Sequence, residues 1–446
     1  MRIKRSTIFE VILFHLFLTV YYFTFPQKDA WGPAAFLLLI VAALVWLEYR
    51  RTKLFVSPLL FWYVFWLAVI VIGRMDLDLY PFYQTWGEDL LKLVLLNTAV
   101  FFWLFWAGSA LGTRFRYGKR AGTEAIYSER LADITLCLLV LAVLAFIVNV
   151  ASTGVLPQLT GDANSYRQSF IETRYYRIVN FLRFTFALVP MAWSASKDRT
   201  KKMLLACLTL LLLMEEMLSG WRSFTMQAMI LFLTSLLLVM GRQRKKQKRG
   251  TFGIIAAASV LALVFIGYIA VTRDGVSGAL SEKLQYLEYT LYMYIAPNFL
   301  NLQSGMQNVE PLGRLMYSGE AVMSFFVNFE ELPVIDQSIE AFNVSTYLLD
   351  PWADFGWSGT VLWTAAISGL SGTILEVSLQ SKKCFPTVLL GICNCVIFLM
   401  HNNFFLRATS VLVWIVLSAG ISIFITGYKK EAKPNGKTFL QNQYSL

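Results

Sequence analysis

Histidine is almost missing from this chain of 446 residues, which contains only His15 and His401. The two lie far apart in the sequence, and no HExxH or CxxC spacing occurs. Phosphate-binding glycine patterns are missing as well, since the chain has neither a P-loop nor a dinucleotide-binding fingerprint. We therefore expect no metal and no cofactor, and a substrate that arrives already activated.

Cysteine is also sparse, and its five positions exclude a disulfide framework. Every cysteine falls inside or at the edge of an apolar run, and none lies in a long polar loop. Cys393 and Cys395 are two residues apart and would face different sides of a helix, which argues against a metal pair. We interpret all five as small packing residues.

Acidic residues are fewer than basic ones: the chain has 28 Asp and Glu and 39 Lys and Arg, which gives a net charge of +11. The densest basic run, residues 241–250, directly follows an apolar stretch. Such a run fixes the orientation of a membrane protein and meets anionic lipid. We therefore expect a lipid bilayer as a partner and no nucleic acid.

Apolar residues dominate what is present: they make up 57% of the chain, aromatic residues make up 15%, and the mean hydropathy is +0.56. A membrane-spanning helix needs about 20 mostly apolar residues. The sequence predicts an all-α, polytopic membrane protein with about twelve transmembrane helices, at residues 7–25, 32–49, 57–73, 90–112, 131–150, 178–195, 203–220, 222–240, 252–271, 358–379, 385–402 and 408–427.

The basic residues predict the orientation of these spans. Most Lys and Arg lie in every second gap between the apolar runs and in the two tails. This is the positive-inside pattern, and it places both termini in the cytoplasm. The first apolar run is too long for a signal peptide and lacks a small-residue cleavage site, so we interpret it as a retained anchor. We expect a multi-pass protein of the cytoplasmic membrane.

The chain divides into four predicted parts. Residues 1–271 hold nine spans, 272–357 form a large extracytoplasmic loop, 358–428 hold three spans, and 429–446 form a cytoplasmic tail. Within the loop we expect a helix over 282–300, broken at Pro297-Asn298, and a second over 314–329 after Pro311-Leu312-Gly313.

Arginines form the exception to the charge pattern, because several lie on the predicted outer face. The guanidinium group offers a planar fork of donors that suits phosphate. At the start of a span, free backbone N–H groups also favour an anion. Snorkelling to the interface or a surface ion pair is the structural alternative. The arginines concerned are Arg74, Arg167, Arg174, Arg177, Arg183, Arg222, Arg273, Arg314 and Arg407.

Acidic and aromatic residues gather before the tenth span. Asp354 is the first candidate for a general base that accepts a proton from a sugar hydroxyl, with Asp350 and Glu320 next. The alternative for Asp354 is the N-cap of the tenth span. Tyr347 and Trp352 offer flat rings suited to packing on a sugar.

The turn before the last span adds His401, Asn402 and Arg407 as candidate substrate-binding residues. A histidine in such a position also serves as a packed, hydrogen-bonded residue, and we keep that interpretation open for His401.

These features together resemble the Wzy-type O-antigen and oligosaccharide repeat-unit polymerases. The resemblance lies in the roughly twelve spans, the Gly220-Trp221-Arg222 turn, and a large late loop that ends in Asp354-Phe355-Gly356-x-x-Gly359. It implies a GT-C-like, metal-independent membrane glycosyltransferase whose site faces the periplasm or the cell exterior. Its substrate would be an undecaprenyl-pyrophosphate-linked oligosaccharide, polymerised into O-antigen, capsule or exopolysaccharide.

The resemblance also implies roles and partners. Arg222 and Arg273 would bind the pyrophosphate, with Arg167, Arg314 and Arg407 as further substrate-binding residues. A flippase and a chain-length regulator of the same pathway would be partners.

Two alternatives stay open. A glycan ligase of the same membrane class differs only in its acceptor, which the sequence does not reveal. A flippase or exporter would carry ionisable residues inside its spans. Glu10, Glu215, Glu216 and Glu376 are the notable acids there, and an ion pair with Arg222 is the structural explanation for Glu215-Glu216.

Overall fold

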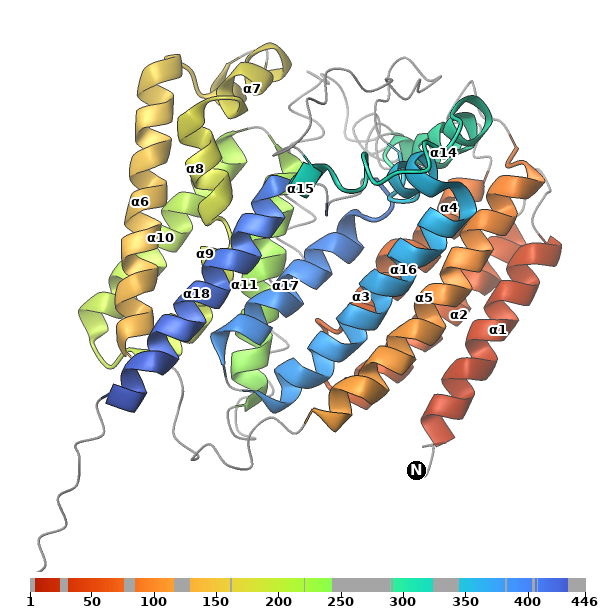
Figure 1. Cartoon of the computed structure of the whole chain (residues 1–446), viewed down its shortest axis with the longest axis horizontal. Coiled ribbons are helices and arrows are strands. Elements are labelled where there is room, and N and C mark those ends of the chain that lie inside the picture. The colour runs from red at the N-terminus through yellow and green to blue at the C-terminus, as the bar shows by residue number, and fades with distance from the viewer. Residues whose placement is uncertain are drawn as a thin grey trace, which may run out of the picture.

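The computed structural model is helical wherever it describes the chain, and it contains no β-strand in those residues (Figure 1). The described residues are 5–24, 31–75, 85–115, 129–160, 163–219, 221–242, 289, 292–323, 345–381, 383–402, 406 and 408–431. The predicted ninth span, at 252–271, lies outside them. The all-α prediction is confirmed for the described part.

One group of helices combines the beginning of the chain with a late segment. Its members pack side by side and lean in the same direction (Figure 1). They are α1 (Arg5–Thr24), α2 (Trp31–Thr52), the continuous run α3 (Pro58–Trp62), η1 (Tyr63–Leu67) and α4 (Ala68–Arg74), α5 (Glu88–Arg114), and α16 (Leu349–Gln380).

A second group comes from the middle of the chain. Here α11 packs on α9, and α6 packs on α8, α9 and α10. The members are α6 (Glu129–Thr153), η2 (Pro157–Leu159), α7 (Ala163–Ile171), α8 (Arg174–Leu182), α9 (Thr185–Ala195), α10 (Arg199–Leu218) and α11 (Arg222–Arg242).

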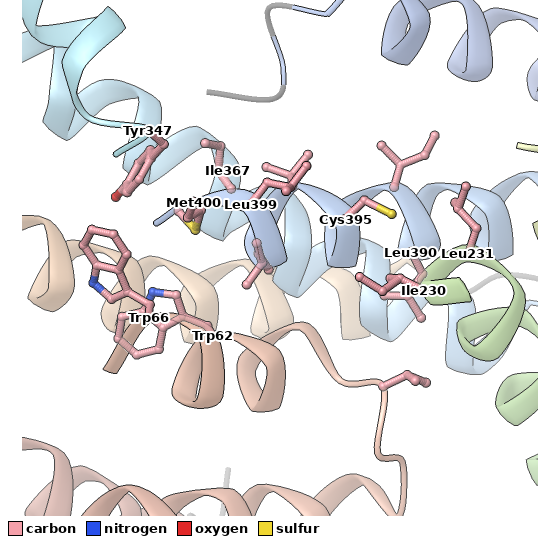
Figure 2. Close-up of a cluster of buried hydrophobic side chains, with 14 of the residues drawn as sticks. Trp62, Trp66, Ile230, Leu231, Tyr347, Ile367, Leu390, Cys395, Leu399 and Met400 are labelled. Atoms are coloured by element: carbon pink, nitrogen blue, oxygen red, sulfur yellow. The ribbon is translucent and has the colours of Figure 1, made fainter. Parts of the chain in front are cut away.

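Helix α17 (Cys384–Leu399) joins the two groups, and α18 (Thr409–Glu431) packs beside it. Figure 2 shows side chains of α17 between Trp62 and Trp66 on one side and Ile230 and Leu231 of α11 on the other. The core is thus continuous across both groups, and burial of these apolar and aromatic side chains holds them together.

Helices α14 (Ala296–Asn308) and α15 (Glu320–Met323) lie with α7 at the end of the molecule opposite the N-terminus (Figure 1). We call this end the loop side. It corresponds to the outer face in the predicted topology.

The closest helix pair is α5 with α16, and small residues allow the approach. A Cβ on Gly108 would lie 2.0 Å from the Gly369 carbonyl oxygen, and one on Gly372 would lie 2.2 Å from that of Phe105. In a membrane, small residues let two helices approach closely, so that their backbones pack and their polar groups can form hydrogen bonds across the contact. Thr373 Oγ1 donates to the Gly108 carbonyl oxygen (3.0 Å), and Ser109 Oγ donates to Glu376 Oε1 (2.7 Å).

Five described helices are long and apolar enough to cross a membrane, and the pair α8–α9, bent by 48°, makes a sixth if it counts as one span. Four shorter apolar helices accompany them at Thr7–Phe23, Pro58–Arg74, Cys384–Leu399 and Thr409–Ile425. The protein is therefore a multi-pass membrane protein. Twelve spans, and their orientation, stay predictions.

The bend between α8 and α9 is stabilised by side chains from other helices. A bend frees a carbonyl from the helical hydrogen-bond pattern. The Asn180 carbonyl accepts the indole N–H of the buried Trp414 on α18 at 2.9 Å. Arg183 at the bend is itself fully buried.

Of the two predicted helices of the large loop, the first is broken near Pro297-Asn298 as expected. Residues 292–293 are helical, Tyr294 and Ile295 form a turn, and α14 carries Pro297 in its first turn, where the N–H that proline lacks has no partner. Over 314–329, the described residues become helical only at Glu320, because the preceding backbone N–H groups bind a side chain instead.

Candidate functional site

The side chain that binds those N–H groups is Asp354. Its Oδ1 accepts the backbone N–H of Met316 (2.9 Å) and Tyr317 (2.8 Å), and its Oδ2 accepts that of Ser318 (2.8 Å) and the Ser318 hydroxyl. The carboxylate is fully buried. Successive N–H groups arranged in this way form a concave anion-binding site, and here its occupant is a residue of the same chain.

The rest of the Asp-Phe-Gly-x-x-Gly motif shapes the same place. Gly356 has φ +62° and breaks α16 just after its first turn and a half, a conformation that favours glycine. A Cβ on Gly359 would lie 2.1 Å from the Pro351 carbonyl oxygen. The carbonyls of Ala353 and Asp354 at the break accept the N–H groups of Leu312 (2.9 Å) and Gly313 (2.8 Å). The motif therefore anchors the segment 311–319 onto the break in α16.

Asp354 is consequently not the N-cap of the tenth span. Its carboxylate accepts the N–H groups of Met316, Tyr317 and Ser318, and the helical part of the span begins only after the break at Phe355-Gly356. As a general base, its carboxylate would have to give up donors from three successive residues and reach a substrate from a buried position. The arrangement favours a positioning role for Asp354.

The anchored segment presents Arg314 and Tyr317. Arg314 is exposed, while Tyr317 is partly buried. Partial burial raises the pKa of Tyr317, the negative charges of Asp354 and Asp350 raise it further, and the positive charge of Arg314 opposes them. The predicted residues Arg314, Asp350 and Asp354 therefore lie near one tyrosine.

Glu320 follows as the first residue of α15. Its side chain is partly exposed, whereas those of Asp350 and Asp354 are buried. Of the three carboxylates predicted as catalytic, Glu320 is thus the one a substrate reaches most readily.

Two segments that carry predicted arginines, α7 and the start of α11, meet in the second helix group. The guanidinium of Arg167, on α7, lies 4.6 Å from the ring centroid of Trp221 in a cation–π contact. Trp221 directly precedes Arg222, the first residue of α11. The structure therefore brings Arg167 beside the backbone of Arg222. The Arg222 side chain, Arg273 and Arg407 lie outside the described parts.

Tyr347 lies in the core instead of on an outer surface. Its ring is buried beside that of Trp66 (Figure 2), and the two ring centroids are 5.3 Å apart in an edge contact. Its hydroxyl forms a hydrogen bond with Thr364 Oγ1 at 2.8 Å. Thr364 Oγ1 in turn donates to Asn97 Oδ1 of α5 at 2.6 Å. No ring face of Tyr347 is open to a sugar, so we leave it out of the site.

His401 and Asn402 lie just beyond the end of α17, and both are partly buried. Burial lowers the pKa of His401 to about 4, and its Nδ1 has no hydrogen-bond partner among the described residues. The His401 carbonyl accepts the side-chain N–H of Asn298 at 2.9 Å, which fixes the turn against α14. This placement agrees with the packed interpretation of His401.

Arg183 requires a correction. Instead of anchoring at an interface, Arg183 forms a buried ion pair with Glu216, with Nε–Oε1 at 2.7 Å and Nη2–Oε2 at 3.1 Å. Tyr176 also donates to Glu216 Oε2, at 3.0 Å. Glu216 is thus paired with Arg183, and Glu215 Oε2 has no hydrogen-bond partner within the described residues. The predicted ion pair with Arg222 involves a side chain outside the described parts.

The remaining acids inside spans are partnered as well. Glu10 accepts the Tyr63 hydroxyl (2.7 Å), and Glu376 accepts Ser109 and lies 3.9 Å from Arg51. Such partnered acids serve helix packing, and they weaken the evidence for an ion pathway.

Sequence reasoning missed a cavity of about 210 Å³ on the loop side. It lies between the start of α5, α14 and the break in α16, and α14 is held there because Gln303 Oε1 accepts the Gly87 N–H at 2.7 Å. The spacing of Gln303 and Gln307, one helical turn apart, was the available signal. The lining residues are Gly87, Glu88, Asp89, Leu90, Gln303, Met306, Gln307, Trp352 and Trp357.

Comparison with known families decides the assignment. A family model described as O-antigen polysaccharide polymerase Wzy matches residues 6–353, more than three quarters of the chain. The chain belongs to the O-antigen polysaccharide polymerase Wzy family. No curated protein and no solved structure matched the chain.

Membership of the Wzy family supports an activity of the glycosyltransferase type, the polymerisation of repeat units into polysaccharide. The match includes Arg167, Trp221 and α14, and it ends one residue before Asp354. The resemblance stated from the sequence is therefore confirmed for the family, although the Asp-Phe-Gly-x-x-Gly motif lies outside the matched residues.

Proposed function

We propose that this protein polymerises undecaprenyl-pyrophosphate-linked oligosaccharide repeat units into a surface polysaccharide on the outer face of the cytoplasmic membrane. The acceptor hydroxyl attacks the anomeric carbon of the donor glycan. The bond from that carbon to the pyrophosphate oxygen breaks, the pyrophosphate leaves with its lipid carrier, and the hydroxyl proton passes to a base.

The observation that carries this proposal is the meeting of Arg167 with Trp221 beside Arg222. Charge grows on the pyrophosphate as the glycosidic bond breaks, and fixed guanidinium groups stabilise it. We assign this role to Arg222, Arg167 and, from the sequence alone, Arg273 and Arg407. Arg314, exposed on the segment that Asp354 anchors, is a further candidate.

Cation–π contact with Trp221 holds the Arg167 guanidinium in one place before substrate binds. An arginine fixed in advance loses less rotational freedom on binding than a solvated one. Because cationic side chains would supply the charge stabilisation, we propose that the reaction needs no metal. Three or more His, Cys, Asp or Glu side chains do not come together as a metal site within the described residues.

Glu320 is our choice for the base that takes the acceptor proton, with Asp350 second. Its partly exposed carboxylate begins α15, next to the segment that Asp354 anchors. Geometry comes before pKa in such an assignment, and only Glu320 of the three carboxylates is accessible to a substrate without rearrangement.

Reconstitution tests the function. The purified protein is incorporated into liposomes with the lipid-linked repeat unit of its host, in EDTA and without nucleotide, and products are separated by gel. A ladder of lengths is the expected result. Transport of the lipid across the bilayer without extension would contradict the polymerase assignment and favour the flippase. Unchanged substrate in its leaflet of origin would contradict both assignments.

Arginine variants test the site in the same assay. Arg222→Lys should lose nearly as much activity as Arg222→Ala, roughly a hundredfold, since a point charge cannot replace the two-pronged donor set. Arg199→Lys serves as the matched control, because Arg199 begins α10 and Arg222 follows the other end of that helix. Full activity of Arg222→Lys would exclude bidentate phosphate binding by Arg222.

A further inference from the structure

The cavity at the loop side contains Trp352, whose ring the sequence predicts to pack on a sugar, together with polar residues that have no role so far. We propose that the cavity between the start of α5, α14 and the break in α16 binds an uncharged sugar ring of the glycan substrate. This inference rests on the proposed function, and it names a subsite that holds the glycan away from the pyrophosphate.

Two tryptophans supply the apolar surface. Trp352 and Trp357 lie on either side of the break in α16, with ring centroids 5.9 Å apart and ring planes at 70°. Rings set nearly at right angles offer a corner of two flat faces, on which the C–H surface of a sugar can pack. The volume of about 210 Å³ suits a single ring with bound water.

One of these tryptophans has an unused donor. Trp352 is 9% exposed, and its indole nitrogen is buried with no hydrogen-bond partner in the described residues. A buried donor without a partner costs free energy unless a ligand or water satisfies it. A hydroxyl of the bound sugar is the acceptor we assign to it.

Polar side chains complete the lining with groups that suit hydroxyls. Gln303 uses its oxygen on the Gly87 N–H, which leaves its amide donors for a ligand. Gln307 follows one turn later on α14, and Asp89 contributes an exposed carboxylate that can accept from two neighbouring hydroxyls.

Charge defines the ligand class and separates this subsite from the arginines. Glu88 and Asp89 both line the cavity, and Lys92 pairs with Glu88 at 2.7 Å, which leaves the cavity with net negative charge. A pyrophosphate would be repelled here. Arg167 and Trp221 come from the other helix group, as Figure 1 shows for α7 and α11. The cavity therefore suits a neutral ring and not the reacting end of the donor.

A subsite of this kind contributes ground-state binding more than transition-state stabilisation. Loss of such binding raises KM and leaves kcat unchanged. In the liposome assay, initial rates are measured against repeat-unit concentration for Asp89→Asn, Gln307→Ala and Trp352→Phe. Asp133→Asn is the matched control, because Asp133 is an exposed acid on α6 that pairs with Lys201 at 2.6 Å.

We expect KM to rise about tenfold in each cavity variant, the effect of one lost hydrogen bond to a charged or buried group, with kcat retained. An unchanged KM in Asp89→Asn and Gln307→Ala, or a loss confined to kcat, would overturn the subsite. Trp352→Phe keeps an aromatic ring, so it isolates the indole N–H from the packing.

A second measurement separates failure of the subsite from failure of the polymerase. Saturation-transfer NMR records binding of the lipid-free repeat-unit oligosaccharide to the full-length protein in detergent. If no polymer forms, binding that the cavity variants lose and Asp133→Asn retains still supports the subsite. Equal binding by all variants, or no binding by the unmodified protein, overturns it.

Discussion

At the scale of single residues, the carboxylate of Asp354 changes what its motif means. Four donors from three consecutive residues bind it, and it has no exposed surface. An acid before a span was a reasonable candidate for a base. The structure instead gives it the task of holding Arg314 and Tyr317 at the loop side.

Replacement of this carboxylate tests the anchor. Asp354→Asn replaces one accepting oxygen with an NH₂ group, which faces donors that it cannot accept. We therefore expect the segment 311–319 to lose about 2 kcal/mol of local stability. Hydrogen exchange at the amides of Met316, Tyr317 and Ser318 should accelerate by more than tenfold. Asp133→Asn is the control, and unchanged exchange in Asp354→Asn would remove the anchoring role.

His401 gives a pH-dependent prediction. Its folded-state pKa of about 4 lies below the value near 6.5 of an unfolded histidine, so the unfolded chain binds a proton first as the pH falls. Stability is therefore complete above pH 6.5 and decreases between pH 6.5 and 4, by up to about 3 kcal/mol.

Thermal unfolding in detergent at several pH values measures this effect. His401→Gln should flatten the decline between pH 6.5 and 4, whereas His15→Gln, at the other and exposed histidine, should leave it in place. An identical pH dependence in all three proteins would show that His401 does not titrate as its burial requires.

At the scale of elements, the α5–α16 contact depends on the absence of Cβ atoms. Gly372→Ala would place a methyl group 2.2 Å from the Phe105 carbonyl oxygen and must push the helices apart. We expect a loss of about 2 kcal/mol, typical of overpacking. Gly420→Ala on α18, whose new methyl group would have nothing within 4 Å, should be neutral or stabilising. Thermal unfolding of both variants in one detergent is the measurement.

The sequence predicts an element correctly when the residues that cause its conformation lie within the element itself. An apolar run of span length identifies a helix such as α5 or α6 by itself, because the membrane and not a distant residue imposes it. The prediction of a helix from residue 314 was wrong, because the non-helical course of 314–319 is caused by a side chain 36 to 38 residues away in the sequence.

The same distinction applies to the candidate site. Residue chemistry pointed to Arg167, Trp352 and the acids near α16, since arginine, tryptophan and carboxylates have few other uses on an outer face. Pairing was not predictable, because the contact of Arg183 with Glu216 depends on the bend between α8 and α9. That bend has no marker in the sequence, as no proline or glycine lies at it.

At the scale of the whole molecule, the two helix groups share one core through α17, and both have helix ends on the loop side (Figure 1). A donor glycan and an acceptor glycan must both reach one reaction centre. The arginine-bearing group and the group with the cavity thus offer two different surfaces to the two ends of such substrates.

The predicted orientation of the bundle is testable with single cysteines. In a background without the five native cysteines, Gln307→Cys should react with a membrane-impermeant maleimide in intact cells, or in spheroplasts if an outer membrane is present. Lys201→Cys should react only after permeabilisation, because it belongs to the inner basic pattern. The reverse result would invert the topology and remove the outer-face site.

The anchor of segment 311–319 has a consequence for diversification. Met316 is buried, but Tyr317 is partly exposed, and Asp354 binds its backbone amide, so the anchor imposes almost no requirement on which side chain stands at Tyr317. Substitutions there can alter what the segment presents to a glycan while its course over the membrane stays the same. A lineage whose polysaccharide changes composition could thus retune recognition at this segment without rebuilding the scaffold beneath it.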